Sequence, residues 1–335
     1  MAPEMPEAEY VSALSDLIAR EFGIRFVVGL ELECYHSVLR RGGEELVKCL
    51  GPILAGPTYG GVTVNPELGK GQLEINFQHR SDLRSLLCSV DLAKSVVLEQ
   101  AAQRGVRVSF QARPNLSLPG SGLHVNMSFV SPSSAEPADA KKQNIAIQRV
   151  VVGLLCTMPH GMIFFAPSVD SYFRFRWQCD SADYRFGGAP RSVTWGGKND
   201  RSAAIRLIRS PLDSTDWRIE HRVSGADANP NLVLAVLLAG AAFGLDLKLS
   251  VSEVQDVLES LAISGGGHEQ LPRTLEQSLE VWESEINKAN RESRFSPIFA
   301  AMTSTQEGLA DAFWHRLAEL VLRYSTQTDI FINKG

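Results

Sequence analysis

The sequence has 335 residues, of which 44% are hydrophobic and 21% are charged, and its formal net charge is -5. This composition is typical of a globular protein with one large domain or two smaller ones, and it excludes a disordered chain. Because the balance is acidic and no Lys/Arg-rich run occurs, we expect no nucleic-acid partner and predict small molecules as ligands.

The cysteines and the N-terminus predict the compartment. The five cysteines are widely scattered without a Cys-x-x-Cys pair, which is typical of reduced core residues. The first residues, MAPEMPEAEY, lack the charged and then apolar pattern of a secretion signal. The longest apolar run, 232–244, is too short to span a bilayer and predicts a buried helix after Asn229-Pro230. We therefore expect a cytoplasmic protein without a membrane partner.

Helical and strand patterns are mixed along the chain, without an internal repeat. A polar segment rich in Pro, Ser and Ala at 131–142 predicts an exposed loop. The expected elements, in chain order, are a helix at 7–20, strands at 25–35 and 71–77, a helix with Ser81 as N-cap that ends at Gly105, strands at 106–111 and 123–129, a helix at about 143–156, and strands at 203–208 and 217–223.

The part beyond Ser250 is predicted to be helical to the end. Its expected N-caps are Ser252, Thr274 and either Ser304 or Thr305. We accordingly predict an α+β fold whose main part is 1–250, with 251–335 as a helical C-terminal part of the same domain.

Charged residues stand at every second position of the predicted strand 217–223. Side chains alternate between the two faces of a strand, so Arg218, Glu220 and Arg222 share one face. One interpretation is a ladder of ion pairs on a solvated face.

Four other predicted strands repeat this alternation of polar and apolar residues. Their polar sets contain Glu, His, Arg, Ser and amides but no Lys, whereas a solvated face would normally include Lys and Thr. This composition favours a functional site on the polar face. The polar sets are Glu31 and Glu33; Gln72, Glu74 and Asn76; His124, Asn126 and Ser128; and Arg206.

These residue types indicate a particular chemistry. Carboxylates with one imidazole and no thiolate suit Mg²⁺ or Mn²⁺ better than structural zinc. Arginines bind phosphates or carboxylates through two parallel hydrogen bonds. Together they indicate phosphoryl transfer from a nucleotide, although the sequence contains no P-loop motif.

Five motifs in order resemble the glutamine synthetase catalytic domain, from about residue 20 to the C-terminus. The resemblance implies a curved antiparallel sheet with one polar active-site face, packed by helices, and a helical C-terminal subdomain. GADANPN at 225–231 is similar to the branch that joins glutamate to amines or polyamines, where Gly replaces the acidic residue usual in ammonia-using members. The five motifs are ELE at 31–33, ELGKGQLE at 67–74, GSGLH at 120–124, DRSAAIR at 200–206 and RIEHR at 218–222.

The resemblance also implies roles for individual residues, with ATP and Mg²⁺ or Mn²⁺ as cofactors. Arg176 is an alternative to Arg174, because both would lie on one face of a strand. Asn126 stands where the family usually has a second histidine. The implied roles are metal binding for Glu33, Glu67 and Glu74 at one ion and for Glu31, His124 and Glu220 at the other; glutamate binding for Gly120, His124, Arg174 and Arg222; ATP binding for Asn126, Ser128, Arg201, Arg206 and Arg218; and catalysis for Arg174, Arg201 and Glu220.

Two departures from the family leave two hypotheses open. The sequence begins almost at the catalytic domain, without the small β-grasp domain usual in the family, and 176–192 does not align with the family's flap over the amine site. The protein is then either a ligase that forms a γ-glutamyl amide from glutamate and ammonia or an amine through an acyl phosphate, or a non-catalytic relative that binds nucleotide or a partner. Retention of all six metal ligands favours the ligase, because buried like charges require cations. We expect a homo-oligomer or an assembly in which a partner subunit completes the site.

Overall fold

The computed structural model describes residues 7–37, 42–56, 59–130, 140–176, 189–209, 217–262 and 270–291. The helices within these ranges are α1 (Glu7–Phe22), α2 (Gly42–Leu54), α3 (Leu83–Gln103), α4 (Ala140–Phe165), the 3₁₀ helix η2 (Val169–Arg176), α5 (Pro230–Asp246), α6 (Val251–Leu261) and α7 (Leu275–Arg291). The strands are β1 (Arg25–His36), β2 (Thr63–Pro66), β3 (Gln72–Arg80), β4 (Val108–Ser109), β5 (Leu123–Val130), β6 (Trp195–Gly196), β7 (Ile205–Arg209) and β8 (Trp217–His221).

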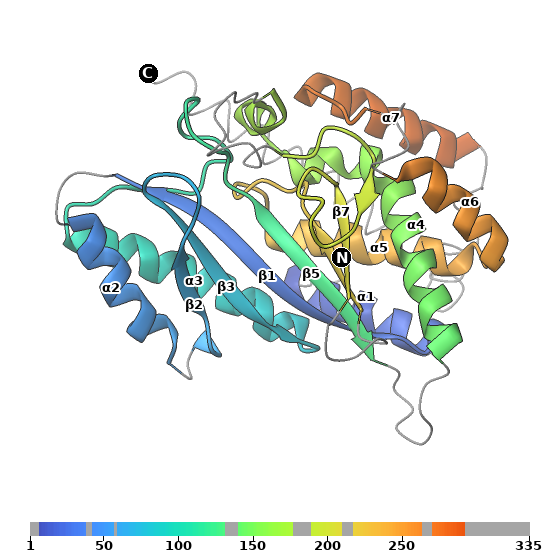
Figure 1. Ribbon diagram of the computed structural model, residues 1–335, viewed down its shortest axis with the longest axis horizontal. Helices are drawn as coiled ribbons and strands as arrows, with labels where there is room; N and C mark the ends of the chain where they lie inside the picture. Colours follow the sequence, from blue (N-terminus) through green and yellow to red (C-terminus); the bar gives the residue numbers. More distant parts are fainter. Residues whose placement is uncertain are drawn as a thin grey trace, which may run out of the picture.

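All eight strands belong to one sheet, in the order β2-β3-β1-β5-β8-β7-β6, with β4 paired to β1 outside this path (Figure 1). Neighbouring strands are antiparallel, except that β6 and β7 are parallel. The long strand β1 lies between β3 and β5 and brings their side chains into register. The α+β fold with a mostly antiparallel sheet is therefore confirmed.

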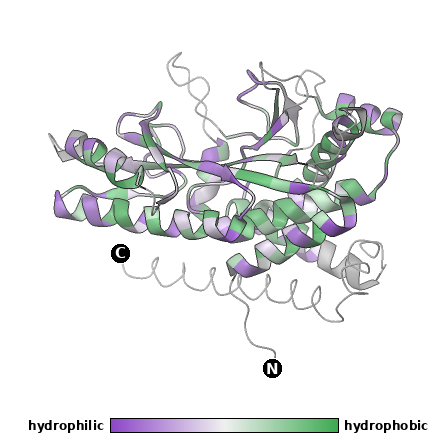
Figure 2. Ribbon diagram, turned by 90° about the horizontal axis from the view of Figure 1, so that it is seen from below, coloured by the Kyte–Doolittle hydropathy of each residue, from purple (hydrophilic) through white to green (hydrophobic). Residues whose placement is uncertain are grey.

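The two faces of the sheet differ as the alternation predicted. Leu30, Leu32, Ile75, Val125 and Ile219, on four neighbouring strands, are each at most 1% exposed and point into the core. Long helices lie along this apolar side of the sheet (Figure 2), and α1 and α3 contact β1 and β3. The opposite face remains available for a site.

The buried helix predicted after Asn229-Pro230 is confirmed as α5. Asn229 caps it by accepting a hydrogen bond from the backbone N–H of Asn231, and Pro230 occupies the first turn. Helix α4 packs along α5. Its stretch Asn144–Phe165 is long and apolar enough to cross a membrane by length and composition, but 72% of that stretch is buried inside the structure. A long apolar helix in the core of a folded protein meets the same criteria of length and composition.

Several predicted element ends are corrected by the structure. The N-cap of α3 is Asp82 rather than Ser81, because the Asp82 carboxylate accepts from the backbone N–H of Ser85. The N-cap of α6 is Ser250 rather than Ser252, and Ser250 forms a capping box with Glu253. In both cases the helix begins after the polar residue whose side chain accepts from the backbone N–H three positions later.

Other corrections concern length. The strand expected at 106–111 is reduced to Val108–Ser109, and α4 begins at Ala140 and continues nine residues beyond the predicted end, through Pro159. Thr274 accepts from the backbone N–H of Gln277 at 3.2 Å, as expected of an N-cap of α7. The predicted caps Ser304 and Thr305 lie outside the described residues, as do positions 131–139 of the loop expected at 131–142. The last three positions of that loop, 140–142, are helical and belong to α4.

One core residue conflicts with its surroundings. His221, on the apolar face of β8, is fully buried with its ring 4.5 Å from that of Phe165, and neither ring nitrogen has a hydrogen-bond partner among the described residues. Burial lowers the pKa of His221 to about 3, so the imidazole is neutral at pH 7. An unpaired buried polar group costs about 1–3 kcal/mol.

We therefore predict that His221→Leu, which has a similar volume and no polar atom, stabilises the protein by about 1–2 kcal/mol. The free energy of unfolding in urea measures this difference. His221→Gln serves as the comparison, because it retains a buried polar group and should bring no gain. A loss of stability in His221→Leu larger than that in His221→Gln would contradict the prediction.

Candidate functional site

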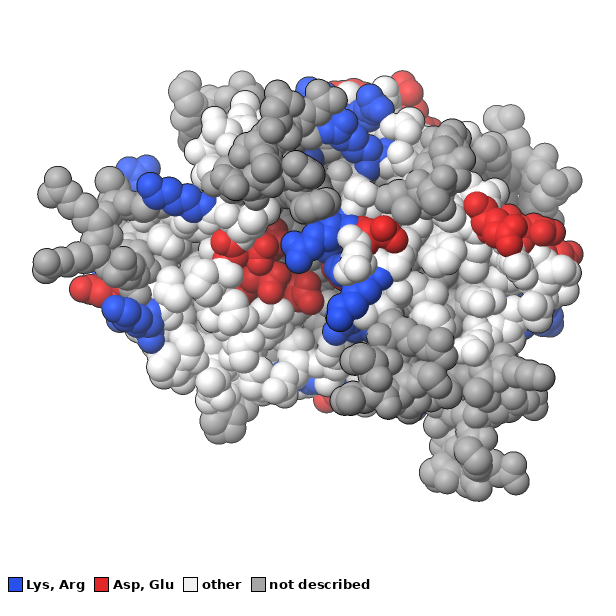
Figure 3. Space-filling view, in the orientation of Figure 1, with Lys and Arg blue, Asp and Glu red and all other residues white. Residues whose placement is uncertain are grey.

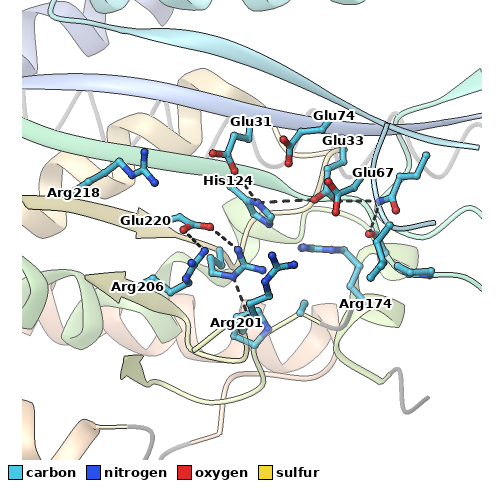
Figure 4. A pocket seen from close by; sticks show the side chains of 17 residues that line it. Glu31, Glu33, Glu67, Glu74, His124, Arg174, Arg201, Arg206, Arg218 and Glu220 are labelled. Atoms are coloured by element: carbon cyan, nitrogen blue, oxygen red, sulfur yellow. Dashed lines mark hydrogen bonds and ion pairs between the residues drawn. The ribbon is translucent and has the colours of Figure 1, made fainter. Parts of the chain in front are cut away.

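A cleft opens on the polar face of the sheet (Figure 4). Acidic residues gather on one side of it and basic residues on the other (Figure 3). Twelve of the predicted site residues line this cleft: Glu31, Glu33, Glu67, Glu74, Gly120, His124, Arg174, Arg201, Arg206, Arg218, Glu220 and Arg222. The structure thus brings together residues from five separate motifs of the sequence.

Strand register places the acidic groups next to one another. Glu33 lies opposite Glu74 across β1 and β3, and Glu31 lies opposite His124 across β1 and β5. The Nδ1 atom of His124 is 3.4 Å from Oε2 of Glu31. One ligand atom each of Glu31, Glu74 and His124 lies within 4.8 Å of the others, close enough to hold one metal ion.

The electrostatics of these carboxylates fit a bound cation. Burial raises the pKa of Glu33, and burial together with the nearby charge of Glu31 raises the pKa of Glu74 to about 7. For Glu31 burial acts in the same direction, but the hydrogen bonds from His124 and Asn126 outweigh it and hold the pKa at about 2. Crowded carboxylate oxygens with one imidazole are ligands that suit Mg²⁺ or Mn²⁺.

Gln72, which has no predicted role in the site, holds Glu33 in place. The Gln72 amide donates to Oε2 of Glu33 at 3.2 Å and to the carbonyl of Gly120 at 3.1 Å, while its oxygen accepts from the backbone N–H of Gly69 at 2.9 Å. The N–H of Gly122 donates to the same Glu33 oxygen at 2.7 Å. The position of Gln72 on the polar face, in the same strand as Glu74, was the sequence signal that could have indicated this role. Its partners Gly69 and Gly120 belong to loops that meet only in the folded chain.

On the basic side, two arginines hold Glu220. Nη1 of Arg206 and Nη1 of Arg222 each lie 2.5 Å from a different oxygen of the Glu220 carboxylate. The three side chains are 14%, 12% and 4% exposed in that order, so the pairs are shielded from solvent. In this conformation Glu220 shares its single negative charge between the two arginines. Among the described residues, Glu31, Glu74 and His124 lie close enough to hold one metal ion, and the implied trio of Glu31, His124 and Glu220 stays a prediction.

Arg174 lies in the 3₁₀ helix η2, which corrects the prediction of a strand shared with Arg176. It is 5% exposed and lines the cleft, whereas Arg176 is exposed. Its Nη1 donates to the carbonyl of Val223 at 2.8 Å. Burial lowers the pKa of Arg174 to about 10, and the charge of Glu33 opposes this change. The guanidinium therefore remains a cation at neutral pH.

Glycine is required where this arginine passes β5. A Cβ atom on Gly122 would lie 2.6 Å from Nε2 of His124 and 3.0 Å from Nη2 of Arg174. The small residue lets the imidazole and the guanidinium face the cleft side by side.

The remaining predicted residues lie elsewhere. Asn126 and Ser128 do not line the cleft; Nδ2 of Asn126 donates to Oε1 of Glu31 at 2.9 Å and so orients that carboxylate. Of the segment 176–192, residues 177–188 lie outside the described ranges, while Ala189 and Pro190 line the cleft.

The family model for the glutamine synthetase catalytic domain matches residues 56–305. The chain belongs to this family. It is 32% identical over 220 residues to gamma-glutamylputrescine synthetase PuuA of Escherichia coli (strain K12). The matched region covers 63% of this chain and 42% of that protein. It is 31% identical over 190 residues to a glutamate–isopropylamine ligase of Pseudomonas sp, covering 55% and 39%, respectively.

A further curated relative and two solved structures are also similar to this chain, the structures in their fold. Type-1 glutamine synthetase 2 of Dictyostelium discoideum is 29% identical over 224 residues, covering 65% of this chain and 40% of that protein. The chain spans half or less of the length of these curated relatives. A Plasmodium falciparum glutamine synthetase structure matches with a TM-score of 0.68 at 13% identity, covering 98% of this chain and 77% of the other. A GmaS/ADP complex matches with a TM-score of 0.66 at 18% identity, covering 90% and 73%. The fold is shared.

The acidic side of the cleft predicts a response to metal ions. We expect millimolar Mg²⁺ or Mn²⁺ to raise the melting temperature, because a ligand bound only by the folded state stabilises it by about 2.7 kcal/mol at a hundredfold excess over Kd. Glu74→Gln should melt at a higher temperature than the parent without metal, since it removes a repelling charge, and should respond less to metal. Thermal unfolding with and without metal measures both effects.

Glu45→Gln, an exposed change in α2, is the matched control and should respond to metal as the parent does. An undiminished response in Glu74→Gln would contradict the assignment of Glu74 as a ligand.

Proposed function

We propose that this chain forms the catalytic part of an ATP-dependent ligase that joins the γ-carboxylate of glutamate to an amine. The observation that carries the proposal is the cleft itself, which is lined by five glutamates, a histidine and five arginines. Few reactions require a site for divalent cations beside a site for phosphates and carboxylates, and phosphoryl transfer to a carboxylate is one of them. The names of the most similar curated relatives support the same reaction class.

The proposed roles follow the two sides of the cleft. Arg174 and Arg222, with the backbone at Gly120, hold the carboxylates of glutamate. Arg201, Arg206 and Arg218 hold the phosphates of ATP, and an arginine can match two phosphate oxygens with parallel hydrogen bonds.

The glutamates and His124 would hold Mg²⁺ or Mn²⁺, which when bound supply charge neutralisation at the phosphates. Gln72 and Asn126 keep two of these carboxylates oriented through hydrogen bonds. The arginines stabilise the charge that develops as the γ-carboxylate of glutamate accepts the phosphoryl group, and the nucleophile then displaces phosphate from the acyl phosphate.

Two observations favour an amine over ammonia as the nucleophile. The cleft includes the apolar side chains of Leu68, Pro119, Ala189 and Pro190, which suit an alkyl chain. Position 225 is glycine, and a Cβ atom there would lie 2.4 Å from Oδ1 of Asp227, so the acidic residue expected in ammonia-using members would have to displace the Asp227 side chain.

The experiment is an assay of phosphate release from ATP with glutamate and a panel of amines that includes ammonia. We expect release that requires glutamate, Mg²⁺ or Mn²⁺ and an alkylamine, and formation of the γ-glutamyl amide in equal amount. Nucleotide binding without release for any amine would support the non-catalytic alternative. Release with ammonia alone would overturn the choice of an amine.

Assembly is tested in parallel. We propose a homo-oligomer, or an assembly with a partner subunit that completes the site, and the mass of the native complex distinguishes the two. A cytoplasmic location is part of the same proposal, and fractionation of cells that produce the protein tests it.

A further inference from the structure

Asp227, in the loop that follows β8, is a buried acid to which the proposed mechanism gives no role. Its Oδ2 atom accepts hydrogen bonds from Oγ of Ser171 at 2.5 Å and from Oγ of Ser168 at 3.0 Å. Burial raises the pKa of Asp227, while the two serine hydroxyls and the charge of Arg174 act against this increase. Through its hydrogen bonds with the two serines, the carboxylate joins the loop 225–231 to the beginning of η2.

The two serines fix the first turn of η2. Oγ of Ser168 accepts from the backbone N–H of Ser171 at 3.2 Å, and Oγ of Ser171 accepts from the backbone N–H of Ser168 at 3.1 Å. Both hydroxyls lie within hydrogen-bond distance of the same oxygen of Asp227, and their own oxygens are 2.8 Å apart, where either hydroxyl could donate to the other. Arg174, the residue of η2 that lines the cleft, follows Ser171 by one 3₁₀ turn. A shift of Ser171 would move the base of Arg174.

The same loop also acts on the charged end of Arg174. The carbonyl of Val223 accepts from Nη1 of Arg174, and the negative charges of Glu33 and Asp227 both favour its cationic form. A buried guanidinium requires such compensation, because removing a charge from water without a partner costs several kcal/mol. Glu33 lies in the cleft, where cations would compete for its charge. Asp227 lies outside the described lining of the cleft, so its carboxylate, when ionised, would favour the Arg174 cation without meeting cations bound in the cleft.

The backbone of this loop accommodates the carboxylate closely. A Cβ atom on Gly225 would lie 2.4 Å from Oδ1 of Asp227 and 3.0 Å from Cβ of Ala112. The glycine that marks the amine-using branch in the sequence thus leaves the space that the Asp227 side chain occupies.

We propose that Asp227 is a positioning residue for the glutamate site: through Ser168 and Ser171 it fixes η2, and with its charge it holds the Arg174 guanidinium where it meets a substrate carboxylate. The inference rests on the proposed function, in which Arg174 binds glutamate. It assigns no contact between Asp227 and the substrate.

The test measures Kd for glutamate and for a non-hydrolysable ATP analogue, by calorimetry in the presence of Mg²⁺. We expect Asp227→Ala and Ser171→Ala to weaken glutamate binding by about tenfold or more, equivalent to about 1.4 kcal/mol, with the nucleotide Kd changed by less than about twofold. Asp227→Asn retains an acceptor for the serines but loses the charge, so its effect should lie between the parent and Asp227→Ala.

The matched control is Tyr172→Phe. It lies in η2 and loses the hydrogen bond from the Tyr172 hydroxyl to Oγ of Ser278 in α7, so it perturbs the same helix without touching Asp227. Glutamate binding should remain close to that of the parent. If Tyr172→Phe weakens glutamate binding as much as Ser171→Ala, the effect reflects general loosening of η2 and the inference is overturned.

The remaining outcomes separate the inference from the function beneath it. A parent protein that binds the nucleotide but no glutamate overturns the proposed function and the inference with it. A parent that binds glutamate, with unchanged affinity in Asp227→Asn and Asp227→Ala, overturns the inference alone. Asp227→Asn is nearly isosteric, so it answers the question even where Asp227→Ala does not fold.

Discussion

Gly153→Ala is expected to destabilise the protein by about 3 kcal/mol or more. Gly153 lies where α4 crosses α5, and a Cβ atom there would be 2.1 Å from the carbonyl oxygen of Gly240 and 2.5 Å from the backbone nitrogen of Gly244. These neighbours are backbone atoms of a helix, which cannot rotate away as a side chain can. A single methyl group must push α4 and α5 apart, and both helices contribute many buried side chains to the core. Urea unfolding monitored by circular dichroism measures the difference.

Gly51→Ala in α2 is the control for the helix propensity of the new residue. Apart from its chain neighbours and the backbone of its own helix, no heavy atom lies within 4 Å of a Cβ atom built at Gly51, so this change should gain at most about 1 kcal/mol, the usual advantage of alanine inside a helix, less the restriction that Pro52 places on the residue before it. The two variants should shift the unfolding midpoint in opposite directions. A gain in stability for both would show that α4 and α5 are further apart than the structure places them.

The sheet was predictable because its signal is local. In a strand the side-chain period is two, so Leu30 and Leu32 could be assigned to the core and Glu31 and Glu33 to the opposite face from spacing alone. Five strands with the same alternation then implied one shared polar face.

Elements without such a pattern were missed. Helix α2 carries Leu46, Leu50 and Leu54 at helical spacing, and all three are fully buried, but Gly51 and Pro52 interrupt the helical pattern. The short strand β2 has meaning only through its pairing with β3. The two-residue spacing of Arg174 and Arg176 predicts one face of a strand, whereas in the folded chain both residues lie in the 3₁₀ helix η2.

The candidate site could be predicted in its membership but not in its pairing. The motifs identified which side chains share the cleft, whereas the partner of each depends on contacts between distant loops. Gln72 joins Glu33 to the backbone at Gly120, and Glu220 pairs with two arginines from separate strand positions. Assignments of individual ligands and of the boundary at residue 250 stay predictions.

The pairing of Glu220 leads to the second large effect. Glu220→Gln is expected to destabilise the protein by about 3–5 kcal/mol, the usual cost of removing one partner from a buried ion pair. Glutamine has nearly the same shape, but it is neutral, and its amide N–H₂ would face one of the two guanidinium groups donor to donor. Arg206 and Arg222 would then be left as neighbouring cations. Burial and the charge of Arg222 already lower the pKa of Arg206, and the charge of Glu220 that opposes this change would be lost. The free energy of unfolding, measured in urea without metal or nucleotide, gives the cost.

Asp16→Asn is the matched control, because it removes the acid of an ion pair at the surface. Nη1 of Arg25 lies 3.1 Å from Oδ1 of Asp16, and the two side chains are 43% and 58% exposed. Water and salt screen such a pair, so the change should cost less than about 1 kcal/mol. Equal costs for the two variants would mean that Glu220 does not pair with the arginines in solution. In that case its carboxylate would be free to join Glu31 and His124 as the resemblance implied. A much larger cost for Glu220→Gln would instead mean that Arg206 and Arg222 hold Glu220. To bind a metal, Glu220 would then have to leave the two arginines, and another anion would have to take its place. The phosphates of ATP are such anions, because arginines bind phosphates and carboxylates in the same way.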